Sequence, residues 1–176
     1  MQPINRKSLP FPIVNVVLYE PEIPPNTGNI GRTVLGINGR LYLVGRLGFS
    51  VDEYHLKRAG LDYWSRLSVR RMEDPNDLHL DDKRFFLFTK GAKTPYFSAT
   101  FRLGDYLIFG SESRGLPQEL LDQYPDRTLQ FPTIGQIRSY NLASSVHSAC
   151  MELVRQNHAI LHPYYRRLER EKAMDQ

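Results

Sequence analysis

Three short segments of the chain are rich in glycine and in small polar or charged side chains, and each follows an apolar run. They are residues 26–32 (NTGNIGR), 110–117 (GSESRGLP) and 138–145 (RSYNLASS). Each is typical of a turn between a strand and a helix. Small polar residues in such turns suit a ligand that lies close to the backbone. Three of them in one chain of 176 residues predict a single composite binding site.

The first segment has a simple structural explanation that covers only part of it. Asn26 can act as a helix N-cap, and Gly28 gives the turn its backbone freedom. Arg32 is not explained in this way, because it lies about 200° around the helix from Ile30 and therefore off the apolar stripe. An arginine near a helix start is also slightly unfavourable for the helix dipole. Arg32 is therefore a candidate functional residue.

The other two segments leave similar choices. Glu112 and Arg114 place opposite charges in a tight turn, and a surface ion pair between them would contribute little. The length of the Gly-x-Glu-x-Arg-Gly-Leu-Pro pattern instead favours function. In the third segment either Ser139 or Asn141 can cap the following helix, which would use only part of its polar side chains.

Several other kinds of site are excluded or disfavoured by pattern. The chain has no Gly-x-Gly-x-x-Gly after its first strand, no P-loop and no nucleophile elbow. Its five histidines show no metal-ligand spacing, so we expect no metal. His158 and His162 are four residues apart, but Pro163 follows and is expected to end the helix there. The single Cys150 allows no internal disulfide and favours a reducing compartment.

Composition indicates one globular domain spanning 1–176, with 1–12 and 166–176 as peripheral extensions. Apolar residues make up 41% and charged residues 24%. There is no membrane-length apolar segment or signal peptide, so we expect a cytoplasmic protein without a membrane partner. The net charge of +4 is compatible with RNA binding but does not require it. Basic clusters at 66–71 and 166–172 are either solvated surface or phosphate contacts.

The apolar patterns predict an α/β fold with a mostly parallel sheet and helices on both faces. Strands are expected at 13–19, 40–45, 63–71, 84–89, 105–109 and 128–131, and helices at 26–37, 51–59, 117–122 and 141–156. A loop with room for one helical turn is expected at 72–82. Ligands of such sheets bind beyond the carboxyl ends of the strands, where the three polar turns fall.

The three motifs, in this order, resemble those of the SpoU-TrmD (SPOUT) class of RNA methyltransferases. Residues 18–30 (LYEPEIPPNTGNI) and 58–63 (RAGLDY) resemble in particular the TrmL/YibK-like tRNA 2′-O-methyltransferases. The resemblance covers about 14–156. It implies a C-terminal trefoil knot, a homodimer, and S-adenosylmethionine as methyl donor. Two departures from the family pattern are Gly31, where many relatives have a bulkier apolar residue, and Ser111, where proline is common.

The resemblance also implies an activity, namely methylation of a tRNA ribose 2′-oxygen at the anticodon wobble nucleotide (position 34, cytidine or modified uridine). The implied catalytic residues are Asn26, Arg32, Glu112, Ser139 and Asn141. The implied donor-binding residues are Leu87, Thr89, Gly110, Phe131, Ile134, Ser139 and Leu142. Because guanidinium stays protonated, Arg32 is expected to orient the ribose and stabilise charge on its oxygen rather than act as a base. A catalytically inactive knotted RNA-binding protein and a base methyltransferase of the same class are the alternatives.

Overall fold

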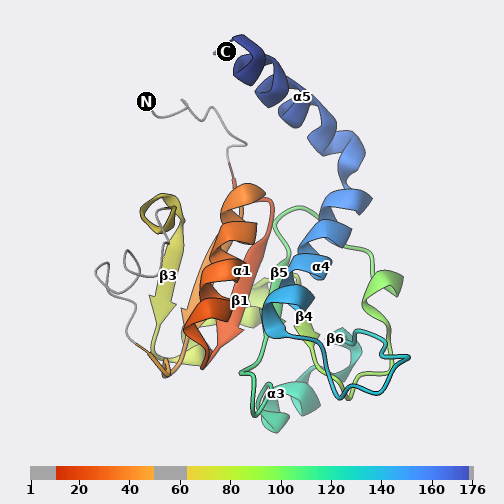
Figure 1. Cartoon of the computed structure of the whole chain (residues 1–176). Coiled ribbons are helices and arrows are strands. Elements are labelled where there is room, and N and C mark those ends of the chain that lie inside the picture. The colour runs from red at the N-terminus through yellow and green to blue at the C-terminus, as the bar shows by residue number, and fades with distance from the viewer. Residues whose placement is uncertain (1–10, 50–62, 175–176) are drawn as a thin grey trace.

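The computed structural model describes residues 11–49 and 63–174, and these form one six-stranded sheet (Figure 1). The strand order is β3-β2-β1-β5-β4-β6, and every pairing between these strands is parallel. Their bounds are β1 Asn15–Tyr19, β2 Arg40–Val44, β3 Val69–Met72, β4 Phe85–Phe88, β5 Tyr106–Phe109 and β6 Thr128–Leu129. The expected parallel α/β sheet is confirmed. From β1 the chain adds β2 and β3 on one side, while β5, β4 and β6 lie on the other side. Sheets of this kind bind ligands at such a switch point, here between β1 and β5.

Helices cover both faces of this sheet. The α-helices are α1 Pro24–Gly36, α3 Gln118–Gln123, α4 Leu142–Gln156 and α5 His158–Met174. Short 3-10 helices are η1 Trp64–Arg66, η2 Pro75–Leu78, η3 Leu80–Asp82, η4 Tyr96–Ser98 and η5 Pro125–Arg127. Helices α1 and α4 pack against each other on one face, and α3, η2 and η3 contribute to the core of the other. The helix expected at 51–59 lies outside the described residues. No helix of the described part is long and apolar enough to cross a membrane.

Alternation along the central strand explains why both faces are covered. Val16 and Leu18 of β1 belong to the core cluster that contains Ile30 of α1 and Val146 of α4. Val17 lies between them in sequence and belongs to the cluster on the opposite face. All of these side chains are fully buried. A strand with apolar side chains on both of its faces needs a cover on each side, and the helices provide it.

Two expected elements differ from the structure. The strand expected at 63–71 begins only at Val69, because residues 64–66 form η1, which packs beside α1. The expectation that Pro163 ends the last helix is wrong, since α5 runs from His158 through Pro163 to Met174. A proline in a helix frees the carbonyl four residues earlier. That residue, Ala159, is exposed, so solvent can satisfy its carbonyl.

Candidate active site

The three polar segments meet beyond the carboxyl ends of β1 and β5 and at the start of α4. Asn141 Nδ2 donates to Asn26 Oδ1 at 3.0 Å, and Asn26 Nδ2 donates to Glu112 Oε1 at 2.9 Å. The first two residues come from the third and first segments, and Glu112 comes from the second. The chain thus joins one residue of each segment in a single hydrogen-bonded row, as a composite site requires.

Asn141 anchors this row to α4. Its Oδ1 accepts hydrogen bonds from the backbone N–H groups of Ala143 and Ser144, at 2.9 and 3.4 Å. It is therefore the N-cap, as one of the two alternatives from sequence predicted. The expected capping role of Asn26 is wrong. Pro24 and Pro25 start α1 two residues earlier, with Ile23 in the cap position. The Asn26 side chain, buried within the first turns, is consequently available to the site.

The Glu112 carboxylate is held from two sides. Its Oε2 accepts the backbone N–H of Glu22 at 2.9 Å, while Oε1 accepts from Asn26. Glu22 in turn accepts both the backbone N–H and the hydroxyl of Ser113, at 3.1 and 2.6 Å. This reciprocal pair fixes the turn after β5 against the loop after β1. Glu22 was not among the predicted site residues, although two glutamates separated by a proline just before the first segment were a signal for it.

Arg114 does not pair with Glu112, so the surface ion pair considered from sequence is not formed. Its guanidinium lies 2.8 Å from Glu20 Oε2 and 4.0 Å from Glu22. The Arg114 side chain is 70% exposed, so this pair contributes little energy. It does, however, tie the same two loops together on the outer side of Glu112.

Gly110 has a structural reason to be glycine. A Cβ atom at this position would overlap the backbone of Gly115 and Leu116. Ser111 and Gly115 bond to each other through their backbones, and Gly115 has φ of 73°, where glycine is favoured. Glycine at position 110 therefore allows the backbone of Gly115 and Leu116 in the same turn to lie close to it. From the sequence, we had expected a ligand to occupy this space.

A cavity of about 800 Å³ opens beside this row, at the carboxyl ends of β4, β5 and β6. Part of its wall is aromatic: the Phe88 ring stacks on Phe109 and Phe131, with centroid separations of 4.4 and 5.4 Å. Its polar side includes Glu112, Ser139 and Asn141. An apolar wall with a few convergent polar groups is the usual character of a small-molecule site.

Most predicted site residues line this cavity. Those that do are Asn26, Thr89, Gly110, Glu112, Phe131, Ser139, Asn141 and Leu142. Leu87 does not, because its side chain is fully buried in the core between β4 and α3. Ile134 is fully exposed to solvent. The roles of all these residues remain predictions.

Arg32 lies outside the cavity, in a neighbouring groove between α1 and α4. The groove is also lined by Asn29, Asn141 and His147. Within residues 11–49 and 63–174, no hydrogen bond or ion pair holds the Arg32 guanidinium, which lies 5.3 Å from the centroid of the Tyr63 ring. The Tyr63 hydroxyl donates to the Gly28 carbonyl at 2.5 Å. Asn141 borders both the groove and the cavity, so it connects Arg32 to the rest of the site.

No three His, Cys, Asp or Glu side chains of the described residues come together as metal ligands would.

The chain matches a known protein family over most of its length. The model of the SpoU rRNA Methylase family matches residues 13–151, and the chain belongs to this family. Its relatives include the tRNA (cytidine(34)-2′-O)-methyltransferase of Escherichia coli strain K12. That protein is 42% identical over 149 residues, which are 82% of this chain and 94% of the relative. The enzyme of the same name from Methylovorus glucosotrophus strain SIP3-4 is 40% identical over 146 residues, covering 81% and 95%.

Solved structures agree with this assignment. One, described as giving insights into the 2-OH methylation of C/U34 on tRNA, has a TM-score of 0.77 and 41% identity, and covers 83% of this chain and 97% of that one. The SpoU methyltransferase AviRb from Streptomyces viridochromogenes, solved with the cofactor AdoMet, has a TM-score of 0.68 at 21% identity, covering 88% and 62%. At that identity AviRb shows only that the fold is shared.

Proposed function

We propose that this chain is an S-adenosylmethionine-dependent tRNA ribose 2′-O-methyltransferase that acts at the anticodon wobble nucleotide, position 34. The observation that carries the proposal is the hydrogen-bonded row of Asn141, Asn26 and Glu112 beside the cavity. Relatives that are 40–42% identical over more than nine tenths of their own length carry this activity in their names. A cytidine or modified uridine is the expected target.

The cavity suits the methyl donor in size and chemistry. Its volume of about 800 Å³ lies in the range of pockets that enclose cofactor-sized ligands. The stacked rings of Phe88 and Phe131 offer an apolar surface to an aromatic base, and the Glu112 carboxylate offers a negative charge to a cation. When bound, S-adenosylmethionine would supply a methyl group on a sulfonium sulfur, which leaves as a neutral thioether and so needs no acid catalyst. Leu87 and Ile134 lie outside the lining of the cavity, and their contacts with the donor stay predictions.

The protein must then orient the ribose hydroxyl and stabilise the charge that develops on its oxygen. Arg32 suits this role, because its guanidinium is exposed and no carboxylate of the described residues neutralises it. A fixed cation beside a developing alkoxide lowers the barrier without accepting a proton. Asn141 borders both the groove of Arg32 and the cavity, whereas Ser139 borders only the cavity, and both are proposed to hold the sugar.

We further propose the trefoil knot, the homodimer and the cytoplasmic location that accompany this activity. Support for the knot comes from the segment after β6. Gln130 exchanges backbone hydrogen bonds with Thr94 and Tyr96, after which the chain returns to α4 on the face that carries α1 (Figure 1). Support for the dimer comes from Arg32, which lies outside the cavity and needs a second surface to enclose the ribose.

The test is methyl transfer to tRNA by the wild-type protein and by Arg32→Ala. The variant is expected to lose at least about a hundredfold in rate, since it removes a charge that acts on the transition state. The Kd of the donor, measured by calorimetry, should change less than about twofold, because Arg32 is proposed to act on the transition state and not on the bound donor. Arg102→Ala, an exposed arginine outside the site, is the control. Unchanged turnover of Arg32→Ala would remove Arg32 from the mechanism.

The same experiment separates the other candidates. Digestion of the product tRNA to nucleosides distinguishes a 2′-O-methyl ribose from a methylated base. A wild-type protein that binds tRNA but neither binds the donor nor transfers methyl would instead be the catalytically inactive RNA-binding protein.

A further inference from the structure

Helix α5 projects away from the rest of the domain (Figure 1). Its 17 residues span about 25 Å at 1.5 Å per residue. Among the side chains that the structure describes in α5, only Leu161 is buried. The family model matches the chain up to residue 151, so α5 lies beyond the matched residues. A long exposed helix of this kind gains little stability from its own domain.

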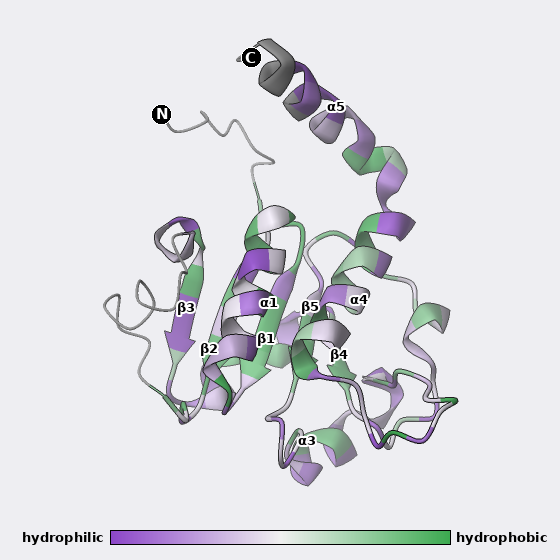
Figure 2. Cartoon of the chain, viewed as in Figure 1, coloured by the Kyte–Doolittle hydropathy of each residue, from purple (hydrophilic) through white to green (hydrophobic). Residues whose placement is uncertain are grey.

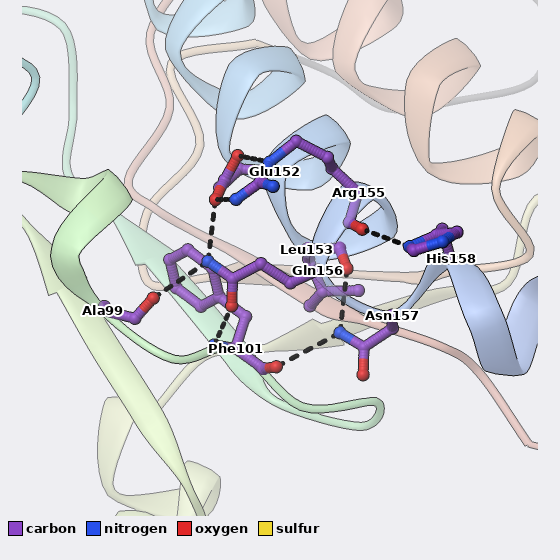
Figure 3. Close-up of polar contacts among 8 residues, drawn as sticks. All are labelled: Ala99, Phe101, Glu152, Leu153, Arg155, Gln156, Asn157 and His158. Carbon is purple, nitrogen blue, oxygen red and sulfur yellow. Dashed lines mark hydrogen bonds and ion pairs between the residues drawn. The ribbon is translucent and has the colours of Figure 1, made fainter.

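The base of α5 is nevertheless firmly held (Figure 3). Gln156 Nε2 donates to the Ala99 carbonyl at 2.9 Å, and Gln156 Oε1 accepts the Phe101 N–H at 2.8 Å. Asn157 Nδ2 donates to the Phe101 carbonyl at 3.1 Å. Two consecutive amide side chains therefore fasten the α4–α5 junction to the loop before β5. The direction in which α5 leaves the domain is set by these contacts.

Basic charge is concentrated on α5. It contains four basic and two acidic residues, a net charge of +2, whereas the whole chain has +4. The coloured turns of α5 beyond its base are mostly hydrophilic in Figure 2. At 100° per residue, Arg166 and Arg170 lie about 140° and 180° around the helix from the buried Leu161. They also lie four residues apart, which places them on one line. The arginines therefore face away from the domain.

We propose that α5 is an RNA-binding arm in which Arg166 and Arg170 contact phosphates of the tRNA substrate at a distance from the methylated nucleotide. This inference rests on the proposed function, which makes tRNA the partner. Guanidinium groups bind phosphate through paired hydrogen bonds. Among the side chains that the structure describes, Arg166 has one competing partner, Glu169, at 3.7 Å, with side chains 61% and 67% exposed. So exposed a pair is weak and yields to a phosphate.

The test compares Arg166→Gln/Arg170→Gln with the control Lys93→Gln/Arg102→Gln. Both remove two positive charges from exposed positions, and glutamine retains helix propensity. In fluorescence anisotropy with tRNA, the arm variant is expected to raise Kd about tenfold and the control less than about twofold. The slope of log affinity against log salt should fall by about 1 to 2 for the arm variant only. Its kcat at saturating tRNA and its donor affinity should equal those of the wild type.

Three results would overturn or redirect the inference. Equal tRNA affinity and salt slope in the arm and control variants would exclude the arm. A changed molar mass in light scattering, with tRNA affinity retained, would make α5 a contact between copies of the chain and also exclude it. If the wild type transfers no methyl group but binds tRNA through these arginines, the proposed function falls and the arm stands.

Discussion

The Asn141 side chain donates to Asn26 across 3.0 Å, although the two residues are 115 positions apart in the chain. The direction of this bond follows from its neighbours. Glu112 can only accept, so the Asn26 amide nitrogen faces the carboxylate and its oxygen faces Asn141. Asn141 then presents its own nitrogen to Asn26 and its oxygen to the α4 backbone. Each amide is oriented without ambiguity, so the row is sensitive to isosteric changes.

Asn26→Asp is the sharpest such change. It replaces the donor that faces Glu112 with an oxygen and brings two carboxylates to hydrogen-bond distance. We expect about 2 kcal/mol lower free energy of unfolding near pH 8, from the lost bond and the buried charge. Close carboxylates share a proton, so the pKa of the folded pair is raised. The folded state then binds more protons than the unfolded one, and stability recovers as pH falls.

Urea unfolding between pH 5 and 8 measures this effect. Asn29→Asp is the matched control, because it makes the same change three residues later on the exposed side of α1. Equal pH dependence in the two variants would contradict the row as described.

Gly110→Ala tests the turn that carries Glu112. The new Cβ would overlap the backbone of Gly115 and Leu116, which no side-chain movement can relieve. We expect a loss of about 3 kcal/mol in the free energy of unfolding, or no soluble protein at all. Gly135→Ala is the control, since nothing lies within 4 Å of a Cβ there. Urea unfolding curves compare the two, and a loss within about 0.5 kcal/mol for Gly110→Ala would show that the turn opens without cost.

Two variants of Tyr63 distinguish its effect on the position of Arg32 from its effect on the stability of α1. Tyr63→Phe removes the bond to the Gly28 carbonyl but keeps the ring under the guanidinium, whereas Tyr63→Leu removes both. Both should lower the free energy of unfolding, Tyr63→Phe by about 1 kcal/mol. Only Tyr63→Leu should lower kcat for tRNA methylation, by about fivefold, because cation–π contact contributes about 1 kcal/mol. Equal kcat in the two variants would mean that the ring does not position Arg32.

Gly31 shows how a departure from the family pattern can be accommodated. A Cβ there would come within 2.9 Å of both Trp64 and Leu67, so these two side chains fill the space that a larger residue at position 31 would need. From sequence, Gly31 was identified only as a departure from the family pattern. The compensating contact comes from a segment more than thirty positions away, which helix propensity does not describe.

The parts predicted correctly depend on local pattern. Apolar runs predicted the buried strands, and the third segment offered two candidates for the cap of α4, of which Asn141 is the one observed. Errors came where local rules competed. Asn26 was expected to cap α1, but Pro24 and Pro25 are equally strong signals for the first turn and start the helix earlier. The local sequence alone does not decide which of these two possible helix starts is used.

The partners of charged residues were the least predictable feature. Arg114 bonds to Glu20, 94 positions away, and not to its neighbour Glu112. This choice depends on β1 and β5 being adjacent in the sheet, with Leu18 opposite Phe109. Strand order is a tertiary property, so the spacing of residues within one motif could not reveal it. The resemblance to a family predicted that the three motifs lie together in one site, but it did not predict these contacts between the loops.

Cys150 offers a prediction that needs no knowledge of the substrate. Its side chain is fully buried in α4, and burial raises the pKa of its thiol to about 12. In the unfolded chain the thiol ionises near pH 8.5. We therefore expect no reaction with a thiol reagent at pH 8 until urea unfolds the protein. Above about pH 9 the unfolded state loses a proton that the folded state keeps, so stability should fall with rising pH. In urea unfolding between pH 8 and 10, the free energy of unfolding of Cys150→Ala should therefore fall less with pH than that of the wild type. The same pH dependence in the two proteins would show that the thiol is less buried than the structure indicates.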